Sequence, residues 1–457
     1  MIGIIKHIVK SKVSDLVFGL IALSLMVVSI LIQQEKIYFK EDLVLVGNTI
    51  SISLETTSKG GVFGMLVGIL YFCSFLYCLG YNKEYHNTAK TRFNALYAFS
   101  AILAFLVSIS ANLFTMFIFY ETLTLATYPL ICFTKNNASV VAAKKYLLYL
   151  ITPSLLLFLP SMMFIYHRCG NLNFSYDGIL AGSGMKNSEI EILYLCTIYG
   201  IGKVALMPFH AWLPTAMIAS APVSGLLHAV AVVKTGIFML TMITYDIFGV
   251  KQLNNAIEKF FGINWLTWIG IIGCITSSLI ALKKHNIKEK LAYSTISHLS
   301  IMVCIIATFN NQAIYLILYY AFAHGIVKIL LFYSNGIIQK ATHETSIMEI
   351  NGLGKIAPFG FSTFLIGVIF IVGIHGSAMY HIKHNISTYL IENDQLIVLL
   401  VILFASMTSV VYLGKIPYYA FCKNIKELYT IHKVDYKMKL AVIIIIIINF
   451  MMYFKFI

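Results

Sequence analysis

The most regular feature of the chain is a repeated alternation of long apolar blocks with short polar connections. The blocks run for about 17 to 28 residues, enough to cross a hydrocarbon layer of about 30 Å at a helical rise of about 1.5 Å per residue. Since that layer holds no water to satisfy backbone groups, each block must form its own hydrogen bonds, which predicts helices. About thirteen spans are expected, at 15–33, 61–81, 93–109, 112–133, 144–166, 189–207, 218–247, 263–282, 289–309, 312–337, 357–380, 394–414 and 438–454.

Composition agrees with this pattern. Of 457 residues, 59% are hydrophobic and 11% charged, and the mean hydropathy is +0.84. The charged fraction is about half that of soluble proteins. The longest polar stretches have about 20 to 27 residues, too few to fold alone. The expected fold class is therefore an all-α polytopic membrane protein without a soluble domain.

The net charge of +14 and pI near 9.2 would also suit a nucleic-acid-binding protein. Only two arginines occur, however, Arg92 and Arg168, and the lysines lie mostly in short loops between apolar blocks. This distribution is typical of loops that set membrane topology, so no nucleic-acid partner is expected. A basic segment at 415–437 is expected either to lie along the membrane face or to act only as such a loop.

The basic loops also predict an orientation. With a cytoplasmic N-terminus, roughly 20 basic residues fall inside and about 8 outside, which follows the positive-inside rule and leaves the C-terminus outside. The first apolar block has spanning length and no small-residue cleavage site, so no cleavable signal is expected. These features favour a bacterial inner (plasma) membrane.

Ionisable residues inside the spans carry the functional signal. A charge at the bilayer centre costs at least about 2.5–3.5 kcal/mol, so such residues usually face a wet interior and serve function. Glu121 lies in the middle of its span and has no basic residue within four positions. Its partner must therefore come from another helix, and without one the carboxylate would be protonated.

A second signal is a lysine beside an interrupted helix. Lys203 precedes Pro208 by five residues, and a proline inside a helix removes a hydrogen bond and kinks or breaks it. His210 follows on the same face, and Pro214 lies in the next loop, so 207–222 is expected to be a re-entrant or interfacial turn. Broken helices of this kind solvate charges in transporters.

The following span carries His228 and Lys234, six residues and about 9 Å apart along a helix. Both are candidates to line one cavity. The alternatives are a lysine that snorkels to the interface, although Lys234 lies deep for that, and an interior histidine that is only hydrogen-bonded.

The same composition recurs downstream. His298 lies in one span, and His324 and Lys328 share one face of the next at i, i+4. Lys383 follows a glycine-interrupted span. Imidazoles beside lysines suit stepwise proton transfer. An interrupted helix with a lysine near 203 and again near 383 favours an internally repeated transporter.

Metal and redox chemistry are not indicated. His381 and His384 have i, i+3 spacing but no accompanying carboxylate or cysteine. The eight cysteines contain no CxxC pair and lie mostly in apolar blocks. Neither a nucleotide fingerprint nor an Fe–S pattern is evident, so no cofactor, metal or catalytic redox site is expected in this chain.

Several segments resemble one known family. MPFHAWLPTAMIASAPVSGLLHAVAVVKTGIF is similar to the signature of antiporter-like membrane subunits, which are the large subunits of Mrp-type sodium/proton antiporters and their relatives in the membrane arm of complex I. FYETLTLATYPLI, KKHNIKEKLAYSTISHLS and AFAHGIVKILLFYSNGII resemble three further family segments. The resemblance covers roughly residues 90–415, and VVKTGIF together with the chain length favours the D-type antiporter subunit.

The resemblance implies about fourteen helices with two inverted five-helix repeats around a hydrophilic axis. It divides the chain into N-terminal helices (1–90), a first repeat (91–247), a second repeat (248–414), and a basic segment with a last helix (415–457). The spans expected from the hydrophobic pattern are one fewer than these fourteen helices, and the missing helix is expected to be the first helix of the family.

The resemblance also implies roles. Glu121 matches the glutamate that pairs with the lysine of the first broken helix, here Lys203, and Lys234 matches the connecting lysine of the next helix. Lys328 matches a lysine between the halves, and Lys383 matches the terminal site. The last break has histidine and glycine where the family has prolines, which predicts a softer break.

The leading hypothesis is a proton- and sodium-translocating subunit of a hetero-oligomeric antiporter complex in the lipid bilayer. One alternative is a proton-pumping membrane-arm subunit of complex I, whose redox chemistry would belong to partner subunits. The other is an accessory paralogue without transport.

Overall fold

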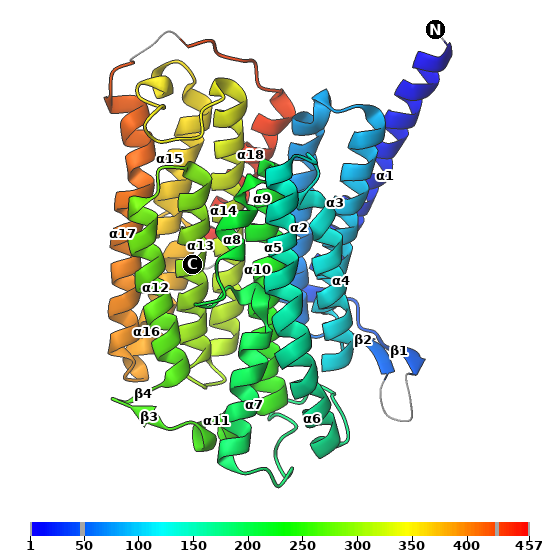
Figure 1. Cartoon of the computed structure of the whole chain (residues 1–457), viewed down its shortest axis with the longest axis vertical. Coiled ribbons are helices and arrows are strands. Elements are labelled where there is room, and N and C mark those ends of the chain that lie inside the picture. The colour runs from blue at the N-terminus through cyan, green and yellow to red at the C-terminus, as the bar shows by residue number, and fades with distance from the viewer. Residues whose placement is uncertain (1, 46–50, 426–428, 456–457) are drawn as a thin grey trace.

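The structure is a computed structural model that describes residues 2–45, 51–425 and 429–455. Long helices with roughly parallel axes form one bundle (Figure 1). Its α-helices are α1 (Ile2–Gln33), α2 (Ser58–Tyr81), α3 (Asn87–Ser108), α4 (Leu113–Ile131), α5 (Asn137–Pro153), α6 (Leu159–Cys169), α7 (Asn187–Gly200), α8 (Trp212–Thr215), α9 (Ala221–Gly225), α10 (Val232–Met242), α11 (Val250–Ala256), α12 (Trp265–Lys283), α13 (Ile287–Ile306), α14 (Ala313–Thr342), α15 (Pro358–Val372), α16 (Ala378–Glu392), α17 (Leu396–Cys422) and α18 (Tyr436–Lys455).

Short 3-10 and π turns join several of these helices. They are the 3-10 turns η1 (Asn82–Glu84), η3 (Gly202–Val204), η4 (Ala216–Ile218) and η7 (Leu353–Lys355), and the π turns η2 (Ser154–Phe158), η5 (Leu226–Val230) and η6 (Ile243–Phe248). Through η2, η5 and η6, the segments α5–α6 and α9–η6 run as long continuous helical rods.

Two small antiparallel hairpins mark one end of the bundle, called the hairpin end below (Figure 1). Strand β1 (Lys40–Leu45) pairs with β2 (Ser51–Glu55), with Lys40 opposite Glu55, and β3 (Lys259–Phe260) pairs with β4 (Ile263–Asn264). The opposite end, called the basic end, carries the connection α17–α18 and the start of α1 (Figure 1).

Within the described ranges, ten helical segments are long and apolar enough to cross a membrane. They account for most of the expected spans. The exceptions are α7 and α15, which are short at 14 and 15 residues, and α13, whose 20 residues include many polar side chains. The prediction of a polytopic, mainly helical membrane protein is confirmed, and the spans enclosed at its centre are α9–η6 and α14.

The expected span 357–380 needs correction. Helix α15 ends at Val372, and a separate helix α16, which the sequence did not indicate, begins at Ala378. Gly373 and Gly376 adopt φ of +86° and +94°, a region that side-chain-bearing residues rarely enter. The break is therefore complete, and the expectation of a softer one is wrong, because glycines alone suffice to end the helix.

The expected spans also misplace two other boundaries. The span 189–207 stops early, since α7 ends at Gly200. Residues 415–422, expected in a surface segment, instead form the last turns of α17. Residues 426–428 of that segment lie outside the described part of the chain.

Candidate functional site

The first broken helix places a lysine in the middle of the bundle. After α7, the chain forms the turn η3 around Lys203, and Ala205 takes a left-handed conformation with φ 55°. The Trp212 indole Nε1–H donates to the carbonyl of Gly202 at 3.1 Å, and the same carbonyl accepts from the Ala205 N–H of the turn at 3.1 Å. The Met207–Pro208 peptide bond is cis. The Trp212 hydrogen bond thus ties the short helix α8 to the turn η3.

Glycines bring this break close to its neighbours. A Cβ on Gly202 would lie 2.9 Å from the Tyr149 carbonyl oxygen of α5. A Cβ on Gly236 of α10 would lie 2.8 Å from the backbone carbon of Lys203. Helix α10 thus packs directly on the interrupted segment, and only glycine permits that distance.

Lys203 is completely buried. Its Nζ donates to the Tyr120 carbonyl at 2.5 Å and lies over the Tyr120 ring, while its backbone N–H donates to the Tyr120 hydroxyl at 3.2 Å. Glu121, the next residue of α4, accepts a hydrogen bond from the Ser154 hydroxyl at 2.7 Å. Glu121 and Lys203 interact electrostatically, but no ion-pair contact joins them within the described ranges.

The second buried lysine meets a histidine. Lys234 of α10 and His324 of α14 are both completely buried, and Nζ lies 2.5 Å from Nδ1. The His324 ring in turn lies against His298 of α13, with ring centroids 4.7 Å apart. The His298 Nδ1 is 2.8 Å from the Tyr320 hydroxyl. Three helices therefore bring one lysine and two imidazoles into contact.

The other ring nitrogens of these imidazoles are unpaired. The Nε2 atoms of His298, His324 and His228 have no hydrogen-bond partner among the protein atoms described. Buried polar atoms in proteins usually bond to protein or to ordered water. The second nitrogen of each ring is thus available to a proton or a water molecule.

The contacting residues Lys234, His324 and His298 are called the lysine–histidine line below. Lys328 and His228 lie beside this line. The Lys328 Nζ donates to the Leu291 carbonyl at 3.1 Å, and the His228 Nδ1 is 3.1 Å from the Thr295 hydroxyl. The Lys328 and Lys234 ammonium groups both act electrostatically on His228.

Lys383 lies at the second break. Its Nζ donates to the carbonyls of Ile371 and Val372 at 3.1 and 2.8 Å and to the Ser406 hydroxyl at 2.9 Å. A cation at the carboxyl end of a helix is stabilised by the unpaired carbonyls and the helix dipole. Lys383 thus lies across the break from the end of α15, and its charge acts on His298.

The structure leaves some candidates outside the line. His210 is half-buried near Tyr293, with ring centroids 6.3 Å apart, and its Nδ1 is unpaired. Pro214 lies in the short helix α8, beyond the break. In the residues that the structure describes, no group of three or more His, Cys, Asp or Glu is arranged to hold a metal ion.

A family comparison matches residues 110–409 to the transmembrane family of NADH:quinone oxidoreductases and Mrp antiporters. The chain belongs to this family.

Curated relatives agree with this membership. NADH-quinone oxidoreductase subunit L of Rickettsia conorii is 30% identical over 325 residues, which cover 68% of this chain and 46% of that protein. NAD(P)H-quinone oxidoreductase chain 4-2 of Synechocystis sp. is 28% identical over 275 residues, 59% of this chain and 47% of that protein. The chain spans about half the length of the curated relatives it matches.

Two solved structures share the fold. A chain of the Mrp complex from Dietzia sp. superposes with a TM-score of 0.84 at 15% identity and covers 99% of this chain and 92% of that one. A chain of the membrane-bound sulfane sulfur reductase, an archaeal respiratory membrane complex, gives 0.76 at 20% identity and covers 98% and 96%. The Mrp-like architecture is thereby established.

Sequence reasoning missed the uncharged partners and one ion pair. Tyr120, Ser154, Tyr320 and Ser406 are ordinary membrane-helix residues whose roles appear only when neighbouring helices are in place. The ion pair joins Lys59 of α2 to an aspartate near the end of the α9–η6 rod, at 2.5 Å. Charges at the ends of apolar blocks were the available signal, but they resemble ordinary span boundaries.

Proposed function

We propose that this chain is the membrane-embedded proton- and cation-translocating subunit of a multisubunit monovalent cation/H⁺ antiporter, and that protons move along its buried Glu, Lys and His residues. The observation that carries the proposal is the contact between Lys234 and His324, which lies between the two broken helices. A buried cation without a carboxylate partner is costly. A chain that retains several such lysines gains something other than stability from them.

The Lys234–His324 contact supports a balanced proton step. The Lys234 ammonium gives a proton to the Nδ1 lone pair of His324 and becomes a neutral amine. The imidazole then holds a proton on each nitrogen and can release the one on Nε2, which is unpaired. His298, whose ring lies tilted against that of His324, is the next acceptor toward Lys383.

Glu121 is proposed to control the loading of Lys203. In this structure Glu121 is hydrogen-bonded to Ser154 while Lys203 donates to the Tyr120 carbonyl. If Glu121 leaves Ser154 and pairs with Lys203 instead, the carboxylate favours the charged form of the lysine. When Glu121 returns to Ser154, Lys203 releases its proton toward Lys234. Lys328 and His228 are proposed to modulate the line through their charge, and His210 to serve its basic-end access.

The repeats and the orientation belong to the same proposal. The breaks at Lys203 and Lys383 support a first repeat at 91–247 and a second at 248–414. The basic end is proposed to face the cytoplasm, with the C-terminus on the opposite side of a bacterial inner membrane.

The test is cation-driven proton transport in inverted vesicles from a host lacking its own antiporters and carrying the chain with its companion subunits. Lys203→Ala and Glu121→Ala should each abolish sodium-dependent proton movement at normal protein abundance. Unchanged transport in either variant rejects the site. Loss of transport in both variants but also in a surface variant such as Lys186→Ala would point to an assembly defect.

The second candidate is a proton-pumping membrane-arm subunit of an NADH:quinone oxidoreductase. The names of the curated relatives favour it. Co-purification from native membranes separates the two, because redox subunits with the chain support the second candidate and cation-antiporter subunits support the first. The third candidate is an accessory paralogue that does not transport. It requires cation-driven proton transport to be the same with Lys203→Ala as with the native chain.

A further inference from the structure

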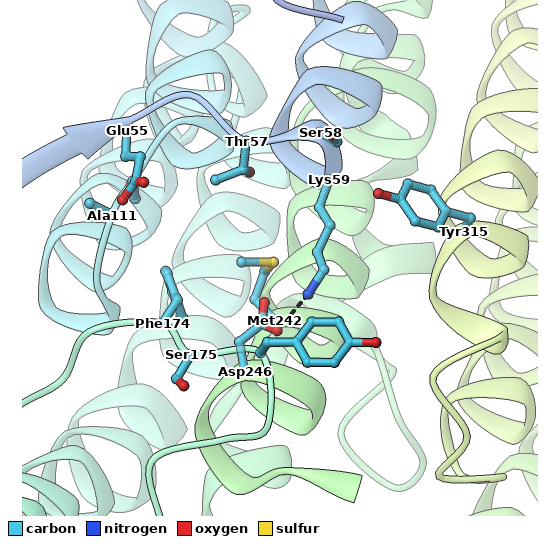
Figure 2. Close-up of a pocket in the computed structure, with 12 residues that line it drawn as sticks. Glu55, Thr57, Ser58, Lys59, Ala111, Phe174, Ser175, Met242, Asp246 and Tyr315 are labelled. Carbon is cyan, nitrogen blue, oxygen red and sulfur yellow. Dashed lines mark hydrogen bonds and ion pairs between the residues drawn. The ribbon is translucent and has the colours of Figure 1, made fainter. Parts of the chain in front are cut away.

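An ion pair lies at the hairpin end of the bundle, away from the lysine–histidine line. Lys59 in the first turn of α2 and Asp246 in η6 approach to 2.5 Å, and their side chains are only 17% and 5% exposed (Figure 2). Enclosing two charges is costly even when they are paired. The pair is therefore a candidate for a role beyond joining α2 to η6.

The pair borders a cavity of about 250 Å³. Oxygen-bearing side chains of Glu55, Ser58 and Ser175 share its lining (Figure 2), and so does Ser110. Ser175 is exposed. A polar space of this size holds several water molecules. The cavity thus brings water from the hairpin end to Asp246.

An aromatic stack lies inward of this cavity. Phe63 of α2 and Phe238 of α10 stack with ring centroids 4.6 Å apart and an interplanar angle of 8°. Both rings are almost completely buried. They offer no hydrogen-bonding group, so a dry stack of this kind interrupts a chain of water.

Sequence spacing places the stack between the ion pair and Lys234. Phe63 follows Lys59 by four residues, one turn further into α2. Phe238 follows Lys234 by four residues, and the next two steps of four lead to Met242, which lines the cavity, and to Asp246. From the hairpin end inward, each of the two helical segments therefore carries first a charged residue and then a phenylalanine.

We propose that the Lys59–Asp246 pair and its cavity form the hairpin-end mouth through which protons reach Lys234, and that the Phe63–Phe238 stack closes this mouth. The proposal rests on the proposed function, since it supplies the access that a buried lysine requires. In this proposal the Asp246 carboxylate binds a proton from water in the cavity, and its ion pair with Lys59 separates as the stack opens.

The first test measures passive proton permeability in vesicles that carry the complete complex under an imposed pH gradient and no driving cation. Phe63→Ala and Phe238→Ala should each raise the leak several-fold, because water from the cavity fills the space that the ring leaves. Phe63→Leu and Phe238→Leu should keep the route closed. Phe361→Ala removes an equally buried ring of α15 that faces Phe421, and it should leave permeability unchanged. A tight membrane in the folded Phe63→Ala and Phe238→Ala variants would overturn the proposal.

The second test does not require transport. In a background whose eight cysteines are replaced, Met242→Cys should react with an impermeant thiol reagent added from the hairpin side and not from the basic side. Leu240→Cys on the same helix is completely buried and should react from neither side. Equal reactivity of the two positions, or labelling of Met242→Cys from the basic side, refutes the mouth. Labelling as expected in a chain whose transport does not depend on Lys203 would reject the proposed function and leave the mouth intact.

Discussion

The side chains of Lys234 and His324 meet in the middle of the bundle, with Nζ 2.5 Å from Nδ1, although 90 residues separate them in the chain. Both are completely buried, and the contact joins α10, which packs on the first broken helix, to α14. It therefore connects the part of the proposed proton route near Lys203 to the part near His298 and Lys383.

His324→Gln should lower cation-driven proton transport by about 100-fold or more, because glutamine keeps a polar side chain but carries no titrating nitrogen, and a positioned proton-transfer group contributes on the order of 10²–10⁴ in rate. The measurement is the initial rate of proton movement in vesicles, corrected for the amount of protein. The same exchange at His432, which packs on His343 outside the line, is the control and should have no effect. Full activity in His324→Gln would remove this residue from the route.

Gly236→Ala should destabilise the protein by about 1–3 kcal/mol, the usual cost of forcing extra volume into a packed interior. The new methyl group would lie 2.8 Å from the backbone of both Lys203 and Val204, which cannot move without disturbing the break. A lower melting temperature in detergent, together with reduced transport, is the expected result. Gly414→Ala meets no atom within 4 Å and should leave both quantities unchanged. Similar behaviour of the two variants would show that the close contact between α10 and η3 is not required.

Lys383→Ala should lower stability as well as transport. The Ile371 and Val372 carbonyls lose their donor, and an unsatisfied buried acceptor costs about 1–3 kcal/mol. Ser406→Ala removes only the third partner and should cost less in a thermal melt. If Lys383→Ala melts like the native chain, Lys383 does not hold the end of α15.

The surroundings of Asp435, which lies outside the membrane-spanning segments, predict that the stability of the fold depends on pH. Burial opposes its ionisation, but the hydrogen bond from the Lys437 N–H at 2.9 Å and the Lys83 ammonium at 3.2 Å hold the pKa of this carboxyl below its ordinary value. A lowered folded-state pKa stabilises the fold above the unfolded pKa of about 3.9, and the effect is lost as pH falls through the folded value. The melting temperature of Asp435→Asn should therefore be lower than that of the native chain at pH 7. The difference should shrink as the pH falls below about 4 and disappear below the folded-state pKa. A difference that persists there would show that charge is not its cause.

Charged residues within apolar blocks were predictable from the sequence, because their cost in a membrane makes each one conspicuous. Glu121, Lys203 and Lys234 were found in this way, and the break near Lys203 followed from proline and glycine. Contacts between helices were not predictable, since spacing relates residues only within one helix. The Tyr120 carbonyl as the acceptor for Lys203 is such a contact.

The second break shows a different limit. Glycine and histidine in place of proline indicated a softer interruption, whereas the backbone at Gly373 and Gly376 is left-handed and the helix stops. Hydropathy then extended α15 by several residues and missed α16, because an amphipathic helix with two histidines and a lysine does not resemble a span.

The central claim is that Lys203 and Lys383 lie on one proton route through the chain. The most direct measurement compares cation-driven proton transport in vesicles carrying Lys203→Ala, Lys383→Ala and the double variant, each at matched abundance of the assembled complex. A single route predicts that either substitution alone abolishes transport and that the double variant is no worse. Partial rates in both single variants, with complete loss only in the double variant, would contradict the account and indicate two independent routes.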